Sequence, residues 1–338
     1  MIPLEHLGKQ MEAASRIPAG NSPTSWRLIG YLLLCFIPIV LTWDLVRLVA
    51  TLALDNDTYS HIPLIPLVSV YLIYFNRRSI FSNISTSWAS GIALMGPGAI
   101  AIVAARLNVW HLSSANQLSL IVLGFVIIWI GSFGLVFGTS SFHSALFPLL
   151  FLLFMVPIPE PLLSKSIAFL QEESARATAV MFGVLGVPFL QNDLVFTLPG
   201  MAIRVAKECS GIRSTLALLI MTVLASHMFL RTTWKQVLVC CLVVPLSIAK
   251  NGLRIATLSA LAVYVDPQFL TGPIHHEFGG MLFFAAAFVP LALLFVVLQK
   301  TESTKTESDP GPRIEMIGRS VGRWSVFSKS VKIHWSGK

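Results

Sequence analysis

The chain has 338 residues, of which 55% are hydrophobic and only 12% are charged, and its mean hydropathy is +0.75. This composition excludes a soluble globular protein and indicates a polytopic membrane protein. The formal net charge of +8 is read as the basic excess that orients membrane helices, so no nucleic-acid partner is expected. Three of the four cysteines fall inside apolar segments, which argues against a disulfide framework.

Eight apolar segments are predicted to be transmembrane helices, because they approach the roughly 20 residues that cross a bilayer. The fold class is therefore an all-α polytopic membrane protein. The polar residues 1–27 are expected to be a cytoplasmic segment rather than a cleavable signal peptide. Residues 299–338 are expected to be a basic, partly disordered cytoplasmic tail that touches membrane lipid. The eight segments are residues 28–43, 59–76, 89–106, 118–138, 142–159, 211–230, 237–264 and 278–298.

The loop charges predict the orientation of these helices. With a cytoplasmic N-terminus, fifteen Lys and Arg residues fall in the cytoplasmic segments and six fall in the external ones. The positive-inside rule therefore predicts that both termini are cytoplasmic. An even number of spans agrees with this arrangement.

Proline and glycine predict local features of several segments. Pro63 and Pro66, close behind Tyr59 and His61, predict a kinked or partly unwound start to the second segment. Small residues in the third and fourth segments predict close helix packing. These small residues are Gly96, Gly98, Gly124, Gly131 and Gly134.

The region between the fifth and sixth segments is too charged to cross the membrane. Alternate prolines from Pro157 to Pro161 are expected to stop the fifth helix at the outer surface. Residues 162–187 then predict an extracytoplasmic amphipathic helix on the outer leaflet. Two β-prone runs flank Pro199-Gly200 and predict a small β-hairpin over residues 191–206, just before a cysteine.

That cysteine, Cys209, lies directly before the sixth apolar segment, and Gly211 allows a tight turn beside it. We expect Cys209 to lie in the first turn of the helix, where free N–H groups and the helix dipole favour a thiolate. A cysteine that merely caps the end of a membrane helix is the structural alternative.

Arg254 is the unusual residue of the seventh segment. It lies ten residues before Tyr264, which is about 15 Å along a helix, so it is expected in the outer half of the bilayer. A charge at that depth costs roughly 2.5–3.5 kcal/mol by insertion scales and needs a partner or a water-filled pocket. A structural ion pair is the alternative, but the apolar segments offer almost no acids.

His275 and His276 lie at the end of the last outer loop, just before the eighth segment, on the same predicted outer side as Cys209 and Arg254. These residue types suit acyl transfer: a thiolate attacks a carbonyl, an imidazole moves the proton and a guanidinium stabilises the oxyanion. Adjacent histidines point to different helix faces and no regular ligand spacing is present, so neither a metal nor a cofactor is expected.

Five motifs, in order along roughly residues 40 to 298, resemble the exosortase group of the exosortase/archaeosortase family. Residues 28–298 are accordingly expected to be an exosortase-like transmembrane catalytic domain. The motifs are Tyr59-Ser60-His61-Ile62-Pro63-Leu64-Ile65-Pro66-Leu67, Pro157-Ile158-Pro159, Cys209-Ser210-Gly211-Ile212-Arg213-Ser214, Asn251-Gly252-Leu253-Arg254 and His276-Glu277-Phe278-Gly279-Gly280.

The resemblance implies a cysteine protease, presumed transpeptidase, of the inner membrane of Gram-negative bacteria. Its partners would be exported proteins that end in a Pro-Glu-Pro motif, a transmembrane helix and a basic cluster. The family's catalytic residues fall on Cys209, Arg254 and His276, with the site on the periplasmic side. His275 and His61 remain alternatives to His276.

Further residues are candidates for substrate binding. Arg213 and Lys207, together with Arg254, could form a cationic pocket for the substrate glutamate. The candidates are Arg213, Lys207, Asn251 and His61.

Two other functions compete with this interpretation. A transporter or channel could use Arg254 and Lys250 to bind an anion, and would tolerate loss of Cys209. A membrane acyltransferase for exopolysaccharide export would also use polar groups in the membrane but needs no nucleophilic cysteine. A purely structural or assembly role is the third possibility.

Overall fold

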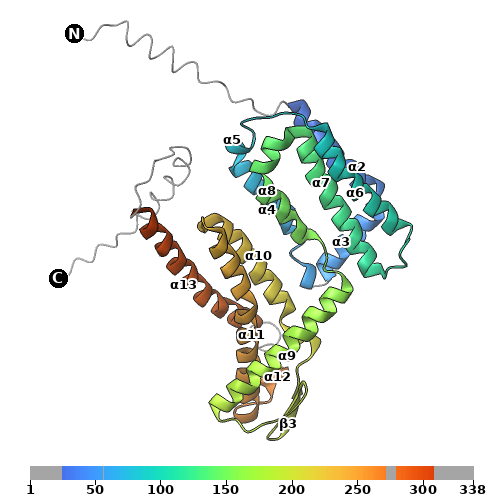
Figure 1. The fold of residues 1–338 in the computed structure, drawn as a ribbon. Coiled ribbons are helices and arrows are strands. Elements are labelled where there is room, and N and C mark those ends of the chain that lie inside the picture. Colours follow the sequence, from blue (N-terminus) through green and yellow to red (C-terminus); the bar gives the residue numbers. More distant parts are fainter. Residues whose placement is uncertain (1–24, 56, 272–278, 308–338) are drawn as a thin grey trace, which may run out of the picture.

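The computed structural model describes residues 25–55, 57–271 and 279–307, and these residues are mostly helical. Figure 1 shows one group of helices formed by α2 to α8 and a second formed by α10, α11 and α13, with α9 running from one group to the other. The helices are α2 (Ser25–Leu41), α3 (Trp43–Asp55), α4 (Leu64–Phe75), α5 (Arg77–Ile80), α6 (Trp88–Arg106), α7 (Ser114–Ser144), α8 (Leu146–Phe151), α9 (Glu160–Leu185), α10 (Ile212–Phe229), α11 (Thr233–Tyr264), α12 (Gln268–Thr271) and α13 (Gly279–Glu307). Short 3-10 turns are η1 (Asp57–Tyr59), η2 (Leu152–Met155) and η3 (Lys207–Ser210).

The apolar helices confirm a multi-pass membrane protein. By length and composition, four helical stretches of the described residues can cross a membrane: α7, α10, α11 and residues 282–302 of α13. A fifth span is possible if α8–η2 and α9, which are bent by 84°, count as one. The apolar stretches of α2, α4 and α6 fall at three more of the predicted segments but are shorter, so the number eight stays a prediction.

The first and last described residues lie toward the same end of the molecule. In Figure 1 the start of α2 and the end of α13 both lie in the upper part, and the small sheet lies at the bottom. This arrangement agrees with an even number of crossings. Which end faces the cytoplasm stays a prediction.

Helices α6 and α7 approach each other closely at glycines, as predicted. A Cβ atom on Gly98 would lie 2.8 Å from the Gly124 carbonyl oxygen, and one on Gly124 would lie 2.7 Å from the Gly98 carbonyl oxygen. Gly131 likewise lies against Met95. The prediction was wrong for Gly96, which has open space around it.

The prolines act where the sequence predicted. Helix α4 begins only at Leu64, after Pro63, and residues 60–63 form turns, so the start of the second segment is unwound. The 3-10 turn η2 ends at Met155, before Pro157, and the chain then bends by 84° into α9. The fifth predicted segment therefore stops at its prolines.

The predicted hairpin belongs to a three-stranded antiparallel sheet with strand order β1-β2-β3. Strands β2 (Val195–Leu198) and β3 (Met201–Arg204) pair with Leu198 opposite Met201, across the turn at Pro199-Gly200. Gly200 has a φ of +80°, which favours glycine. Strand β1 (Leu190–Asn192) was not predicted.

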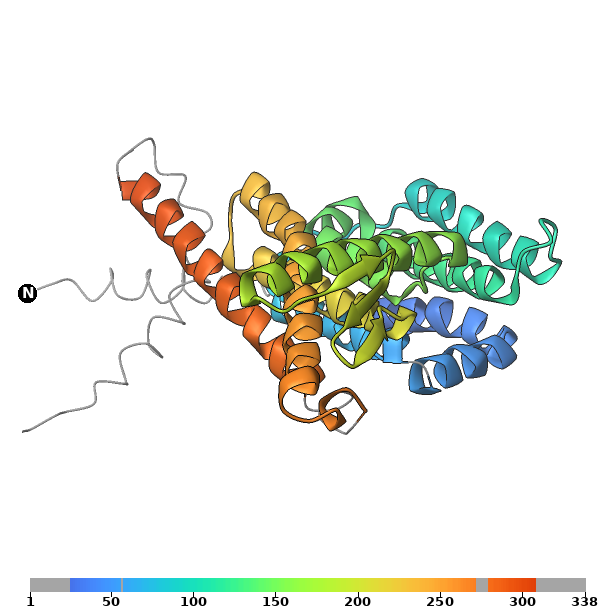
Figure 2. The same cartoon turned by 90° about the horizontal axis from the view of Figure 1, so that it is seen from below.

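Helix α9 is the predicted amphipathic helix, and one face of it packs on α11. Seen from the sheet end in Figure 2, α9 lies across the ends of the other helices beside the sheet. Close approach depends on Gly252 of α11, where a Cβ atom would lie 2.7 Å from the Ala177 Cβ. The buried residues of α9 are Leu170, Gln171, Ser174, Ala175, Thr178 and Phe182.

Candidate active site

The backbone around Cys209 is a short 3-10 turn that is separate from the helix after it. Cys209 lies in η3, and α10 begins three residues later, at Ile212. Between them Gly211 has a φ of +76°, a conformation that a residue with a Cβ atom adopts only with strain. The prediction that Cys209 lies in the first turn of the helix was therefore wrong, because Gly211 redirects the chain before the helix starts.

Asn251 of α11 stabilises this turn by a hydrogen bond to its backbone. Its side-chain amide Nδ2 donates to the carbonyl oxygen of Cys209 at 2.7 Å and to Ser174 Oγ of α9 at 3.0 Å. Asn251 is buried, with 1% exposure, so these bonds form away from water. The one amide group thus ties η3, α9 and α11 together directly behind the cysteine.

Cys209 lines a cavity of about 390 Å³ between the sheet and α11. One wall is residues 201–205, which are β3 and the residue after it, and the other is the last turns of α11 with Pro267. The residues from α11 are Arg254, Ile255, Leu258 and Ser259. The walls are mainly apolar, and the polar or charged side chains among the lining residues from η3 and α11 are Cys209, Arg254 and Ser259.

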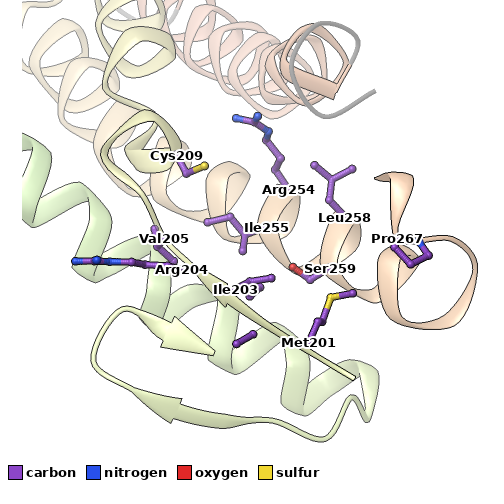
Figure 3. A pocket seen from close by; sticks show the side chains of 11 residues that line it. Met201, Ile203, Arg204, Val205, Cys209, Arg254, Ile255, Leu258, Ser259 and Pro267 are labelled. Atoms are coloured by element: carbon purple, nitrogen blue, oxygen red, sulfur yellow. The ribbon is translucent and has the colours of Figure 1, made fainter. Parts of the chain in front are cut away.

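The structure brings Cys209 and Arg254 to the same cavity, although 45 positions separate them in the sequence. In Figure 3 the cysteine sulfur points toward the Arg254 side chain, which extends from α11 on the opposite wall. A thiol and a guanidinium that face one space can act on one bound group. This is the juxtaposition that the sequence analysis predicted for these two residues.

The other predicted site residues lie elsewhere or outside the described residues. His275 and His276 belong to residues 272–278, which the structure does not describe. Lys207 and Arg213 are exposed and neither lines the cavity. His61 also lies away from the cavity lining, with Nε2 3.2 Å from the Phe154 carbonyl oxygen.

Sequence reasoning missed two residues that the structure places in or behind the site. Ser259 lines the cavity, and Ser174 supports Asn251. Ser259 lies eight residues after Asn251, so the two share one face of α11. A search for polar residues at four-residue intervals in the seventh segment would have found Ser259, whereas the partner from α9 could not be found that way.

The described residues contain no group of three or more His, Cys, Asp and Glu side chains arranged to hold a metal ion. The residues that face the cavity are instead suited to covalent and electrostatic chemistry. A thiol can act as a nucleophile, and a guanidinium can stabilise a developing negative charge.

A known protein family matches most of the chain. Residues 53–293 match the family model described as transmembrane exosortase (Exosortase_EpsH). Because the match covers most of the chain, the protein belongs to the transmembrane exosortase family. No curated protein and no solved structure matches the chain.

Proposed function

We propose that the protein is a membrane-embedded cysteine peptidase and transpeptidase whose nucleophile is Cys209. The observation that supports this most strongly is the shared cavity, in which the thiol faces the guanidinium of Arg254. Membership of the exosortase family agrees with it, since that family is generally one of cysteine proteases and transpeptidases. The cavity also provides mainly apolar walls, which strengthen electrostatic interactions inside it.

In the proposed reaction the thiolate of Cys209 attacks a peptide carbonyl carbon and forms a new S–C bond. Arg254 stabilises the negative charge that develops on the carbonyl oxygen. The C–N bond then breaks, the amine leaves with the proton that the Cys209 thiol gave up on forming the thiolate, and the acyl group stays on sulfur as a thioester. Water or an acceptor amine attacks the thioester and restores the thiol. Proton transfer by His276 stays a prediction.

We propose that the substrates are exported proteins with a C-terminal Pro-Glu-Pro motif, a transmembrane helix and a basic cluster. The apolar faces of the helices suit a substrate helix in the membrane, and the motif would reach the cavity at the sheet end, on the periplasmic side of the inner membrane. Arg254, whose side chain lines the same cavity as Cys209, is then a cation available to the substrate glutamate. Lys207 and Arg213, which are exposed on either side of Cys209 in the sequence, would attract it from outside.

The competing transporter function has less support. It needs Lys250 and Arg254 to share an anion site, but Lys250 does not line the cavity and donates instead to the Ser214 hydroxyl. The acyltransferase alternative gives no role to the half-buried thiol of Cys209 in the cavity. Neither alternative explains why the Cys209 thiol and the Arg254 guanidinium line the same cavity.

The test is to express a tailed substrate with wild-type enzyme, Cys209→Ala or Cys241→Ser and to measure the length of the product. Cys241 is an exposed cysteine of α11 and is the matched control. We expect shortening by the wild type and Cys241→Ser, and none by Cys209→Ala. Shortening by Cys209→Ala at the wild-type rate would exclude the proposal.

A further inference from the structure

The cavity lies along the β3 edge of the sheet, between that edge and α11. Five consecutive residues, 201–205, line it, and no residue of β2 does. A cavity over a face would touch alternate residues of neighbouring strands, because successive side chains point to opposite faces. Lining by every residue of one strand therefore means that the free edge of β3 faces the cavity.

The register shows which backbone groups lie on that edge. The Val205 N–H donates to the Leu194 carbonyl oxygen at 2.9 Å, so the backbone N–H and C=O groups of Val205 face β2. Hydrogen-bonding direction alternates along an antiparallel strand. Ile203 and Met201 therefore also turn toward β2, while the N–H and C=O groups of Ala202 and Arg204 turn outward. In the described part of the chain no strand pairs with this side of β3.

The side chains of β3 leave this edge open. Met201 and Ile203 pack against the core cluster between the sheet, α9 and α11. Ala202 and Arg204 are exposed, and Figure 3 shows the Arg204 side chain extending away from the cavity. What Arg204 contributes to the cavity is therefore its backbone.

The opposite wall carries a buried polar group that has no partner in the described part of the chain. Ser259 has 0% exposure, and its hydroxyl oxygen has no hydrogen-bond partner among the described residues. It lines the cavity across from β3, and Figure 3 shows it beside Ile203 and Met201. A buried hydroxyl without a partner is costly, and a bound group with a carbonyl or N–H would relieve that cost.

We propose that the peptide segment of the substrate binds in an extended conformation as a fourth strand on the free edge of β3. This proposal rests on the proposed function, since it names how the same site holds its peptide. The outward groups of Ala202 and Arg204 pair with alternate substrate residues, and Ser259 bonds the substrate backbone from the other side. An unpaired strand edge is a ready template for such β-strand addition.

The strand leads the substrate to the nucleophile. Beyond Arg204 the chain continues through two residues into η3, which holds Cys209 at the same cavity. The edge also suits a segment with prolines two apart, because a proline is tolerated in a strand where its nitrogen faces away from the neighbour. In a Pro-Glu-Pro segment the glutamate N–H would face β3 and both prolines would face away.

The test is an N-methyl scan of a synthetic peptide that carries Pro-Glu-Pro and its flanking residues, cleaved by the full-length enzyme in lipid nanodiscs. N-methylation of the glutamate, or of the one residue two positions from it that pairs with the other outward residue of β3, should lower kcat/KM at least about tenfold, because it removes a donor and blocks close approach. N-methylation of residues three positions before and after the glutamate, whose N–H groups would face away from β3 as the prolines do, should change it less than about twofold. Equal effects at all positions would overturn strand addition.

A pair of enzyme variants tests the same contact from the other side. Ala202→Pro removes an N–H from the free edge of β3. Gln191→Pro is the matched control, because its partner Phe196 turns toward β3, so the Gln191 N–H faces outward on the opposite edge. We expect Ala202→Pro alone to lower kcat/KM at least about tenfold. A folded Ala202→Pro enzyme with wild-type kcat/KM would contradict the proposal, and the scan decides if that variant does not fold.

The two proposals fail in different ways. If the unmodified peptide is not cleaved, or is cleaved equally by Cys209→Ala, the proposed function is wrong and strand addition has no substrate. If cleavage requires Cys209 but N-methylation shows no alternation, only strand addition is wrong.

Discussion

The packing of α6 on α7 and the packing of α9 on α11 are both close, but they use different chemistry. Between α6 and α7 the contact is made by backbone and apolar atoms at Gly98 and Gly124. Between α9 and α11 polar side chains take part, with Asn251 bonded to Ser174 and to the backbone of Cys209. The first interface stabilises a scaffold, whereas the second also positions the residue proposed as nucleophile.

The difference indicates where function lies in a membrane protein. Polar groups inside the membrane are costly and mark functional sites. In the described part of the chain, the buried side-chain oxygens without a hydrogen-bond partner all belong to α11, at Ser247, Asn251 and Ser259. Helix α11 thus carries buried polar atoms without hydrogen-bond partners, whereas the described residues of α6 and α7 carry none.

The largest effect on stability is expected at the scaffold, from Gly98→Ala. The new Cβ would lie 2.8 Å from the Gly124 backbone oxygen and 2.9 Å from Ile128, so the helices must move apart. Overpacking of this kind costs about 1–3 kcal/mol. Thermal unfolding in detergent should show a lower Tm, with unchanged activity per folded molecule. Gly96→Ala is the control, because Gly96 has open space; an equal loss there would refute the close-contact explanation.

The next effect is expected from Gly211→Ala, which alters the active-site turn. Its φ of +76° is unfavourable for alanine by about 1–2 kcal/mol. The Cβ would also lie 3.2 Å from the Asn251 side-chain carbon, so Asn251 must shift behind Cys209. Activity per folded molecule should therefore fall strongly.

Gly200→Ala separates these two causes. Gly200 has a similar φ of +80°, but a Cβ atom added there would meet nothing within 4 Å. This variant should lose a similar amount of stability and keep more activity than Gly211→Ala. Equal activity losses in the two variants would show that the Asn251 contact is unimportant.

An effect of similar size is expected from Asn251→Ala. It removes hydrogen bonds to Cys209 and Ser174, each worth about 0.5–1.5 kcal/mol net. Because the Cys209 turn loses its support, kcat should fall together with Tm. Ser174→Ala removes one of the two bonds and keeps the bond to Cys209, so its loss of kcat should be smaller. The idea fails if Ser174→Ala is as inactive as Asn251→Ala.

The smallest losses of stability are expected from Ser247→Ala and Ser259→Ala. Both hydroxyls are buried without a partner in the described part of the chain, so removing either breaks no hydrogen bond and should not lower the free energy of unfolding. Ser259 lines the cavity and Ser247 does not. Only Ser259→Ala should raise the KM for a peptide substrate, and an equal rise in both would contradict a substrate contact at Ser259.

Much of the fold could be predicted because hydropathy and proline act locally. The long apolar segments, the break at Pro157 and the turn at Pro199-Gly200 all follow from short stretches of sequence. The close glycine contacts followed from residue size, except that size alone could not show that Gly96 points to open space.

The parts that were missed depend on contacts between distant segments. The start of α10 depends on the backbone of Gly211, and the support of Cys209 depends on Ser174 of α9. Neither the backbone conformation of Gly211 nor the hydrogen bond from Asn251 to Ser174 leaves a periodic signal in the sequence. The meeting of Cys209 and Arg254 could be predicted because both were expected in the outer half of the membrane on neighbouring helices, whereas the free edge of β3 required the sheet itself.

The most direct test of the account is the mass of Cys209 during turnover. The enzyme is mixed with a Pro-Glu-Pro peptide substrate, quenched in acid and digested, and the fragment that carries Cys209 is weighed by mass spectrometry. We expect that fragment to gain the mass of the acyl part of the substrate and to lose it on treatment with hydroxylamine, as a thioester does. Substrate cleavage with no adduct on Cys209, and with undiminished rate in Cys209→Ala, would contradict the account.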